Sequence, residues 1–378
     1  MTKLISIGEE LNFLERDILV YASSEEILFS IGAKEILSIK NPTKGNPWKK
    51  INSFIEKNKG EYIVGYLGFD LHRFRVPNLP EANYPAVHLF VPREVKTRFL
   101  CGFPIEDSLE RLDISRYTRF ADKTYERSVK KVLRWIDDDA EKRATIARKI
   151  ELDKDLNLNT VLRFNRPESK VDRLFYLKTP HIEIAGLSPE LLAQGNPSLF
   201  KTYKLSGTAP VLPSINHQNI LNNQKLLAEH ESSIKRVFES LSKIGNVALS
   251  GPQILKAKNV FHLLTEFKTQ PFQSATITNC LRAVFPSGVF PYEDGLKKIS
   301  EVELDSRGAY YGLIGLIRPD ESFEFSQIIR SFFKERNKSY VWVGAAITKD
   351  STPQGELEET ILKLHGCPFV DTLRGKND

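Results

Sequence analysis

The segments GAYYGLIGLI (308–317), FEFSQIIRSFF (323–333) and SYVWVGAAITK (339–349) decide the fold class. All three are apolar and rich in β-branched and aromatic residues, which is typical of strands. They follow one another without an intervening helix, and a helical segment comes after them at 351–366. Several strands in succession, with helices elsewhere, predict a large α+β domain with antiparallel sheets.

Upstream of these strands, helical and strand periodicities alternate along the chain. Apolar residues at helical spacing predict helices at 121–137, 219–243 and 276–285. A buried strand that leads to a turn is predicted at 60–74, and further strands at 143–152, 173–187, 199–207 and 260–268. The rest of the first hundred residues shows the pattern of short strands and turns.

The composition excludes several classes of protein. Of the 378 residues, 41% are apolar and 27% are charged, which is ordinary for a soluble globular enzyme. The net charge of +6 is spread along the chain without an arginine-rich arm, so we expect no nucleic-acid partner. Cys101, Cys280 and Cys367 lack the spacing of a zinc site or a disulfide framework. No segment approaches a membrane span, and MTKLISIGEELNF (1–13) lacks a secretory pattern, so we expect no membrane partner and a cytoplasmic location.

The segment STPQGELEETILKLHG (351–366) combines a helix start with clustered carboxylates. Thr352 can cap the helix, and the apolar residues that follow recur at i, i+4 and i+7 as a buried stripe. Glu356, Glu359 and Lys363 fall at i, i+3 and i+7 on a second stripe beside it. Such a stripe is either a solvated face with a Glu–Lys pair, or a carboxylate pair that binds a hard cation beside a lysine for an anionic ligand. The helix alone does not decide between the two.

Two further glutamates are candidates for the same chemistry. Glu229 stands before His230 in the middle of the helix predicted at 219–243, and with the pair on the closing helix it would supply the oxygen ligands that Mg²⁺ prefers. A solvent-exposed Glu229 is the plain alternative. Glu190 follows a predicted strand at a Ser-Pro turn, where it is either a general acid or a helix first-turn residue that complements the helix dipole.

Five other residues could contact a ligand. Gly207 has no side chain and, with Thr208, allows a close approach of the backbone. Arg330 and Tyr310 lie within predicted buried strands, and a buried arginine needs an anionic partner such as a ligand carboxylate. His262 lies in an apolar strand segment, where the default is a histidine whose hydrogen bonds are satisfied within the core.

Nine short motifs occur in order along the chain: GLSPELL (186–192), LSGT (205–208), AEH (228–230), NVFHLLTE (259–266), LRAVFPSG (281–288), RGAYYGLIG (307–315), IIRSFF (328–333), VGAAI (343–347) and GELEETILKL (355–364). In this order and rough spacing, the chain resembles the chorismate-utilising enzymes. That family comprises anthranilate synthase and aminodeoxychorismate synthase large subunits, isochorismate synthases and salicylate synthases. The resemblance covers residues from about 120 to the end, and GYLGFDLHRF (65–74) extends it into the N-terminal part.

The resemblance implies a fold, a cofactor and a reaction. The fold is one large α+β domain in which two antiparallel β-sheets pack together with helices outside; residues 1–115 form its N-terminal part and residues 116–378 its chorismate-binding catalytic region. The cofactor is Mg²⁺, with Glu229, Glu356 and Glu359 as its ligands. The reaction is the addition of a nucleophile to the chorismate ring with loss of the C4 hydroxyl, an isomerase or lyase activity.

The resemblance also assigns roles to single residues. Glu190 matches the general acid that protonates the departing C4 hydroxyl. The positions that hold the substrate carboxylates, the enolpyruvyl group or the ring correspond to Gly207, Thr208, His262, Tyr310, Arg330, Gly344, Ala345 and Lys363. Among these, His262 is also a candidate catalytic residue.

The chain departs from the family pattern where a base is expected. Water-adding members carry a lysine base in a KVVLAR-like strand, and a gapless alignment puts Arg143 there, which is a poor base because arginine stays protonated. A one-residue slip would put Lys142 there instead, but it would need a bulge or reverse the faces of the strand. In aminodeoxychorismate synthases a lysine two residues before the threonine of the GT motif can attack the ring, and here that residue is Ser206.

Three hypotheses follow from these matches and departures. The leading one is an isochorismate- or salicylate-forming enzyme, favoured by the absence of a fused glutaminase and by ESSIKRVFESL (231–241), which lacks the Asp-Leu-x-Arg-Asn-Asp sequence of amidating members. The second is an ammonia-using component of the anthranilate or aminodeoxychorismate type, which LRAVFPSG resembles and which predicts a separate glutaminase subunit. The third is a degenerate homologue that binds chorismate or has a changed reaction, favoured by Arg143 and by the reduced turn FPYEDG (290–295).

Overall fold

The structure is a computed structural model that describes residues 16–99, 112–113, 122–137, 139–210, 220–257, 260–273, 275–368 and 370. Its strands are β1 (Ile18–Ala22), β2 (Glu26–Ile39), β3 (Ile63–Leu67), β4 (Val87–Phe99), β5 (Arg143–Glu151), β6 (Arg173–Lys178), β7 (Glu183–Ser188), β8 (Leu191–Asn196), β9 (Leu199–Pro210), β10 (Gly245–Ala257), β11 (Val260–Pro271), β12 (Val289–Phe290), β13 (Leu313–Ile317), β14 (Phe323–Gln327), β15 (Ser331–Glu335) and β16 (Lys338–Ile347). Its helices are α1 (Pro47–Lys57), α3 (Asp122–Ile136), α4 (Val161–Phe164), α6 (Gln224–Ser242), α7 (Ile277–Val284), α8 (Tyr292–Val302) and α9 (Pro353–His365), with the short 3-10 helices η2 (Phe69–Phe74) and η3 (Leu158–Thr160).

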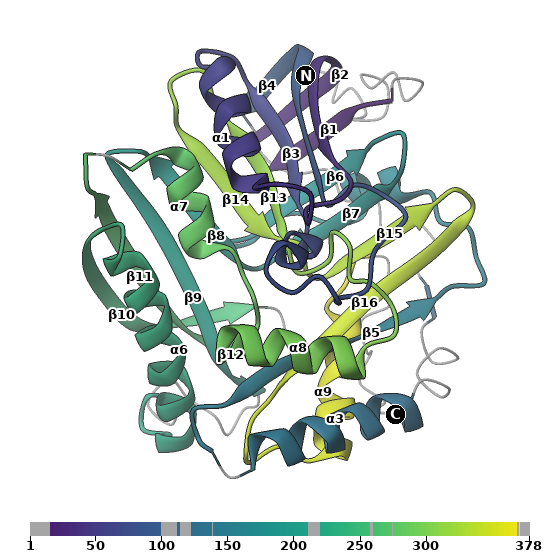
Figure 1. The fold of residues 1–378 in the computed structure, drawn as a ribbon, viewed down its shortest axis with the longest axis vertical. Coiled ribbons are helices and arrows are strands. Elements are labelled where there is room, and N and C mark those ends of the chain that lie inside the picture. The colour runs from purple at the N-terminus through teal and green to yellow at the C-terminus, as the bar shows by residue number, and fades with distance from the viewer. Residues whose placement is uncertain are drawn as a thin grey trace, which may run out of the picture.

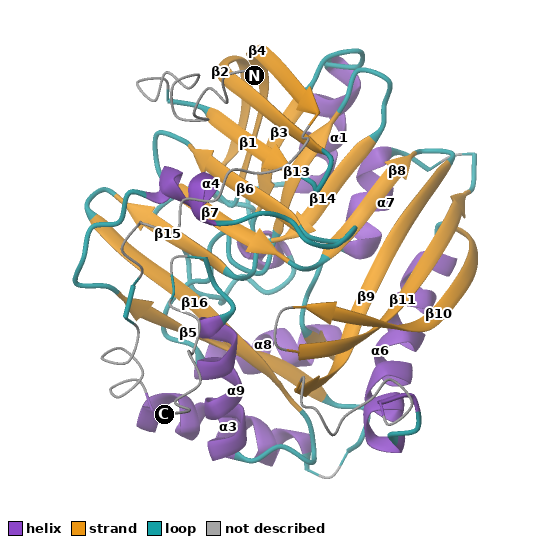
Figure 2. Ribbon diagram, turned by 180° about the vertical axis from the view of Figure 1, so that it is seen from behind, coloured by secondary structure: helices purple, strands orange, loops and turns teal. Residues whose placement is uncertain are grey.

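Antiparallel pairs join the described strands into one sheet of sixteen strands, in the order β10-β11-β9-β8-β14-β13-β3-β4-β2-β1-β6-β7-β15-β16-β5-β12 (Figures 1 and 2). The sheet folds over on itself, because one buried cluster contains side chains from both halves of the order. Tyr66 and Phe90 of β3 and β4 belong to it, as do Phe175 of β6 and Trp342 of β16. The predicted α+β architecture is confirmed, and the two predicted antiparallel sheets are the two halves of this folded sheet.

Apart from the one-turn helix α4, which lies beside β6, the α-helices lie on the outside of the sheet in two groups (Figures 1 and 2). Helices α1, α7 and α6 follow one another along the half of the sheet that contains β8 to β11. Helices α3, α8 and α9 lie together beside β5, β12 and β16. Each group contributes candidate site residues: Glu229 lies on α6, and Glu356, Glu359 and Lys363 lie on α9.

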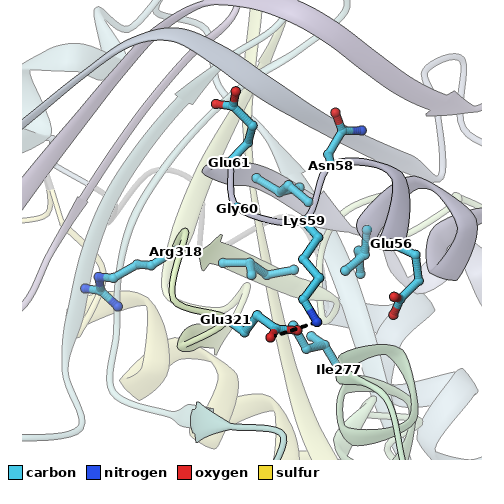
Figure 3. Close-up of a pocket in the computed structure, with 11 residues that line it drawn as sticks. Glu56, Asn58, Lys59, Gly60, Glu61, Ile277, Arg318 and Glu321 are labelled. Atoms are coloured by element: carbon cyan, nitrogen blue, oxygen red, sulfur yellow. Dashed lines mark ion pairs between the residues drawn. The ribbon is translucent and has the colours of Figure 1, made fainter.

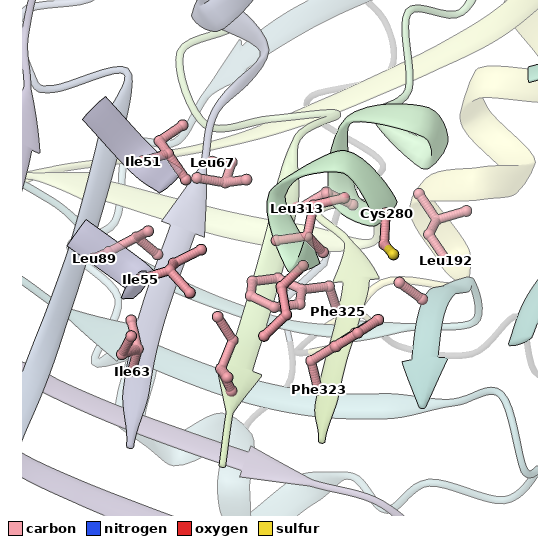
Figure 4. Packing of buried hydrophobic residues seen from close by; sticks show 14 of the residues in the cluster. Ile51, Ile55, Ile63, Leu67, Leu89, Leu192, Cys280, Leu313, Phe323 and Phe325 are labelled. Atoms are coloured by element: carbon pink, nitrogen blue, oxygen red, sulfur yellow. The ribbon is translucent and has the colours of Figure 1, made fainter. Parts of the chain in front are cut away.

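Apolar side chains of α1 and α7 fix the first group to the sheet. In Figure 4, Ile51 and Ile55 of α1 lie beside Leu67 of β3, and Cys280 of α7 lies beside Leu313 of β13; all five are buried in one cluster. Burying one large apolar side chain contributes about 1.5–3 kcal/mol to stability. The buried side chains of this cluster therefore hold α1 and α7 against the sheet.

Two predictions about the strands at 308–333 are wrong in detail. FEFSQIIRSFF is two strands, β14 and β15, and Arg330 between them has a backbone φ of 51°. A non-glycine residue in this left-handed region cannot continue the extended backbone, so Arg330 lies in a connection rather than within a strand. Tyr310 also lies outside a strand, in a turn before β13 where its N–H donates to the carbonyl of Arg307 at 2.9 Å.

Other element boundaries also differ from the sequence predictions. The first hundred residues contain helix α1 and the long strands β2 and β4, rather than short strands and turns. The second half of β2 alternates exposed and partly buried residues, and the second half of β4 is mostly exposed. Both features obscured the apolar pattern of these strands. Residues 173–187 form the hairpin β6–β7, α6 begins at Gln224 after its cap Asn223, and α8 was not predicted. Among the described residues, no helix combines the length and apolar character needed to cross a bilayer.

Candidate active site

Helix α9 begins and packs as the sequence predicts. The Thr352 side chain accepts a hydrogen bond from the N–H of Gly355 at 3.1 Å, and Leu357 and Leu364 are buried. Leu357 belongs to an apolar cluster that includes Ile146 of β5. This packing fixes one face of α9 and leaves the glutamate stripe beside it.

The predicted Glu–Lys pair forms on α9. Glu359 Oε1 lies 2.6 Å from Lys363 Nζ, and the Glu359 side chain is 46% exposed. An exposed i, i+4 pair contributes only about 0.3–0.5 kcal/mol, so its stabilising effect is small. Lys363 also donates to the carbonyl of Gly344 on β16 at 2.9 Å, which ties the helix to the sheet. Glu358 is exposed and accepts a hydrogen bond from Gln354, as expected for a residue that faces water.

The metal site predicted on Glu229, Glu356 and Glu359 is described only in part. Burial raises the pKa of Tyr125, and the charges of Glu356 and Glu359 raise it further while Arg148 opposes them. Both α9 carboxylates are therefore near enough to act on one group. The side chains that the structure describes include no group of three or more His, Cys, Asp or Glu placed to hold a metal ion. Glu229 lies on α6 with its side chain outside the described part, so the three-glutamate site stays a prediction.

Arg330 in the β14–β15 connection, Lys363 on α9 and His262 on β11 come together from distant parts of the chain. Arg330 donates a hydrogen bond to the main-chain carbonyl of Lys363. Burial, followed by the charges of Arg330 and Lys363, lowers the pKa of His262 on β11 to about 4. The result is a neutral imidazole near two cations, an arrangement that attracts an anion such as a carboxylate. Thr208 lies opposite His262 in the β9–β11 register, but the surroundings of Gly207 and the side chain of Thr208 lie outside the described part.

Tyr310, Gly344 and Ala345 lie on the β16 side of the same region. Tyr310 is 3% exposed and stacks on Trp342, with ring centroids 5.6 Å apart. Burial raises the pKa of the Tyr310 phenol, so it stays protonated. Gly344 and Ala345 pair with β5, and the bond from Lys363 to Gly344 connects them to α9.

Arg143 and Lys142 point in different directions at the start of β5. Lys142 precedes the strand, and its Nζ donates to the carbonyl of Trp135 in α3 at 3.2 Å. Arg143 begins the strand and donates to Ser233 Oγ on α6 at 3.3 Å. Burial and repulsion from Arg143 lower the pKa of Arg236, one turn further along α6, to about 9. Arg143 thus faces α6, whereas Lys142 lies against α3.

Glu190 lies at the junction of β7 and β8 and not at a helix start. Its side chain is 12% exposed, and its Oε1 accepts a hydrogen bond from Lys204 Nζ of β9 at 2.8 Å. The Glu190 N–H donates to Ser188 Oγ at 3.2 Å, and its carbonyl accepts from the N–H of Gln327 at 2.9 Å. The alternative of a helix first-turn residue is therefore wrong. The ion pair with Lys204 was not predicted.

A hydrogen-bonded chain beside this pair was also missed. Ser206 Oγ and His230 Nδ1 share a hydrogen bond of 2.6 Å, and His230 Nε2 shares one of 2.8 Å with Thr265 Oγ1. His230 is 1% exposed, and burial together with the charge of Lys204 lowers its pKa to about 4. Because side chains alternate along a strand, the sequence alone could have predicted that Lys204 and Ser206 lie on the same face of β9. It could not have predicted that Glu190 and His230 are the partners of these two side chains.

A pocket at α1 contains none of the predicted site residues (Figure 3). Residues of α1, the loop that follows it and the start of α7 line it, and an ion pair of 3.0 Å joins Lys59 to Glu321. Both side chains of this pair are exposed by more than a third. The pocket is therefore a feature of the surface away from the site residues.

The family model of chorismate binding enzymes matches residues 105–367. The chain belongs to this family. Among curated proteins, anthranilate synthase component 1 of Acetivibrio thermocellus is 24% identical over 84% of this chain and 78% of that protein. Isochorismate synthase MenF of Bacillus subtilis (strain 168) is 28% identical over 62% of this chain and 52% of that protein.

Solved structures of chorismate enzymes share the fold. A putative 2,3-dihydroxybenzoate-specific isochorismate synthase, DhbC, from Bacillus anthracis matches with a TM-score of 0.74 and 19% identity, over 93% of this chain and 94% of that one. Anthranilate synthase component I from Streptococcus pneumoniae TIGR4 matches with a TM-score of 0.75 and 18% identity, over 90% and 92%. The predicted family and the prediction of an enzyme are confirmed. The relatives include both anthranilate synthases and isochorismate synthases. Membership of the family therefore does not tell which nucleophile this chain uses.

Proposed function

We propose that this chorismate enzyme adds a nucleophile to the ring of chorismate with loss of the C4 hydroxyl, as an isochorismate- or salicylate-forming enzyme does. The observation that carries the proposal is the partly buried carboxyl group of Glu190, which a strand junction holds beside Lys204. A carboxyl group in a fixed position can give a proton to a departing hydroxyl as its C–O bond breaks. Arg330 and Lys363, whose charges act on His262, would hold a substrate carboxylate.

Magnesium is part of this proposal. Helix α9 presents the carboxylates of Glu356 and Glu359, and carboxylate oxygens are ligands that suit Mg²⁺. Glu229 on α6 would be the third ligand. Bound Mg²⁺ would neutralise the ring carboxylate of the substrate and so favour loss of the hydroxyl.

One observation favours ammonia as the nucleophile instead of water. Water addition needs a base. Arg143 keeps its proton and so cannot be that base, and Lys142 donates a hydrogen bond to the carbonyl of Trp135 of α3, so it faces away from α6. Ammonia is itself a nucleophile and needs no base to become one. This second candidate is an anthranilate- or aminodeoxychorismate-forming component, and it predicts a separate glutaminase subunit.

Product analysis tests the proposal directly. The purified protein is incubated with chorismate and Mg²⁺, with and without ammonium, and the products are identified by mass. Isochorismate or salicylate without ammonium supports the leading candidate, and an aminated product that requires ammonium supports the second. Chorismate that binds, as seen by calorimetry, but is not consumed would contradict both and indicate a homologue that only binds it.

We also propose that residues 1–115 and 116–378 form one integrated domain. Strands β1 to β4 come from the first part, yet they lie in the middle of the sheet order, between β13 and β6. Neither part alone would contain a continuous sheet. Expression of residues 116–378 alone should give insoluble or unfolded protein, as seen by circular dichroism, and a stable folded fragment would contradict this.

A further inference from the structure

Strands β8 and β9 diverge where Glu190 and Lys204 meet. Their ladder consists of three residue pairs and ends on β9 at Lys201, three residues before Lys204. Beyond this point β9 keeps only its other neighbour, β11, where Lys204 lies opposite Thr265. The register of β8 against β14 shifts beside Leu191, which follows Glu190. The ion pair therefore bridges two strands that no longer share main-chain hydrogen bonds.

The surroundings of the pair are those of a site rather than of an open surface. The side chains of Glu190 and Lys204 are 12% and 24% exposed, compared with 35% and 67% for the pair of Glu35 and Lys57. The charge of Lys204 also reaches His230 on α6, whose pKa it helps to lower. Lys204 thus lies on the side of the sheet that α6 covers, and α6 is also the helix to which Arg143 donates.

This geometry raises a problem for a glutamate that must act as an acid. Glu190 Oε1 is the acceptor in its contact with Lys204, so the proton that lies between the two groups is the one that Lys204 Nζ donates. General-acid catalysis requires a proton at the moment the C–O bond breaks. The ammonium group of Lys204 directs one of its protons at Glu190 Oε1 over 2.8 Å, within the range for direct proton transfer.

We propose that Lys204 supplies the proton that Glu190 gives to the departing hydroxyl, so that the two residues form the acid together. This inference rests on the function proposed above. As the C4–O bond breaks, its electron pair stays with the oxygen, which takes a proton from the Glu190 carboxyl group and leaves as water. The proton on Glu190 comes from Lys204 Nζ, which becomes a neutral amine. Lys204 then regains a proton from the solvent, and the solvent receives the one that the added nucleophile releases.

Because Lys204 acts through Glu190, it is a positioning residue, and two variants separate its proton from its charge. Lys204→Gln removes both. Lys204→Arg keeps a cation that can donate to Glu190, but arginine does not give up its proton in proteins. Both variants should lower kcat on the order of 10²–10⁴-fold and leave the KM for chorismate little changed. Lys201→Gln is the matched control, since Lys201 lies on the same strand, is 40% exposed and pairs with Glu266 instead. It should retain the kcat of the natural protein.

Chemical rescue is a second measurement. Lys204→Ala should regain turnover with methylammonium, which carries a transferable proton, and not with tetramethylammonium, which carries only charge. Mass analysis must show the same product as the natural protein, so that the amine has not added to the ring. A normal kcat for Lys204→Arg, or equal rescue by both ions, would overturn the inference and leave the proposed function standing. A natural protein that forms no product from chorismate would overturn the proposed function and this inference with it.

Discussion

The candidate site contains two Glu–Lys pairs in different surroundings, one at its helix end on α9 and one at its strand end, where β8 leaves β9. On α9, Glu359 and Lys363 pair within one helical turn, and their side chains are 46% and 33% exposed. Where β8 leaves β9, Glu190 and Lys204 pair across strands and are only 12% and 24% exposed. The helical pair is local and solvated, so the proposed Mg²⁺ would have to compete only with Lys363 for Glu359. The strand pair is fixed by the sheet, so its chemistry depends on the fold around it.

The largest effect should come from the strand end. Glu190→Gln keeps the shape of the side chain but has no carboxyl proton, so kcat should fall on the order of 10²–10⁴-fold. Steady-state kinetics with chorismate measures this, and calorimetry should show that chorismate still binds. Glu266→Gln is the matched control, because Glu266 on β11 is 15% exposed and also lies near lysines. Near-normal turnover by Glu190→Gln would mean that the carboxyl group of Glu190 does not donate the proton to the departing hydroxyl.

At the helix end, the expected change concerns the metal. Glu359→Gln would remove a charged ligand of the proposed Mg²⁺ site, and the Mg²⁺ concentration for half-maximal activity should then rise by at least roughly tenfold, as for other changes at metal sites. Glu358→Gln is the control, since Glu358 accepts a hydrogen bond from Gln354 within the exposed side of the same helix. It should leave the Mg²⁺ requirement unchanged. Full activity of chelator-treated natural protein would show that the α9 glutamates form only a solvated face.

The start of β5 should show a smaller, directional effect. Lys142→Ala should leave product formation unchanged and stability within about 0.5 kcal/mol, because the described side-chain contacts of Lys142 are with Trp135 at the end of α3 and with Asp139 just after it. Arg143→Lys should create or increase water addition, because a lysine facing α6 can serve as a base. Isochorismate assays with and without ammonium compare the two variants. Loss of isochorismate in Lys142→Ala would instead favour the slipped alignment.

The smallest effect concerns stability away from both ends. Burial lowers the pKa of His72 to about 4, and the ring is hydrogen-bonded to Tyr292 and to the carbonyl of Pro286. Between pH 6.5 and 4 the unfolded chain therefore binds a proton that the folded protein does not, so stability is full above pH 6.5 and falls towards pH 4. His72→Gln should flatten this part of the dependence, as measured by urea unfolding at pH 8, 6 and 5. An unchanged slope in the variant would mean that His72 does not contribute.

How well the sequence predicted each region follows from the range of its interactions. Helix α9, its cap at Thr352 and its pair at Glu359 and Lys363 depend on residues within two turns, and all were predicted. The strand break at Arg330 was not, because nothing in its apolar neighbours indicates a positive φ. The partner of Glu190 was not predicted either, since Lys204 is fourteen positions away and the strands diverge between them.

The sequence by itself determined the α+β class, the family and most of the candidate residues, because periodicity and short ordered motifs are local properties of the chain. Only the tertiary structure decided which of these residues meet. In it, one sheet of sixteen described strands folds over on itself, Arg143 contacts α6 while Lys142 contacts α3, and Lys204 pairs with Glu190. The physical reason is that side-chain direction alternates along a strand, whereas strand pairing and divergence depend on hydrogen bonds to segments far away in the chain.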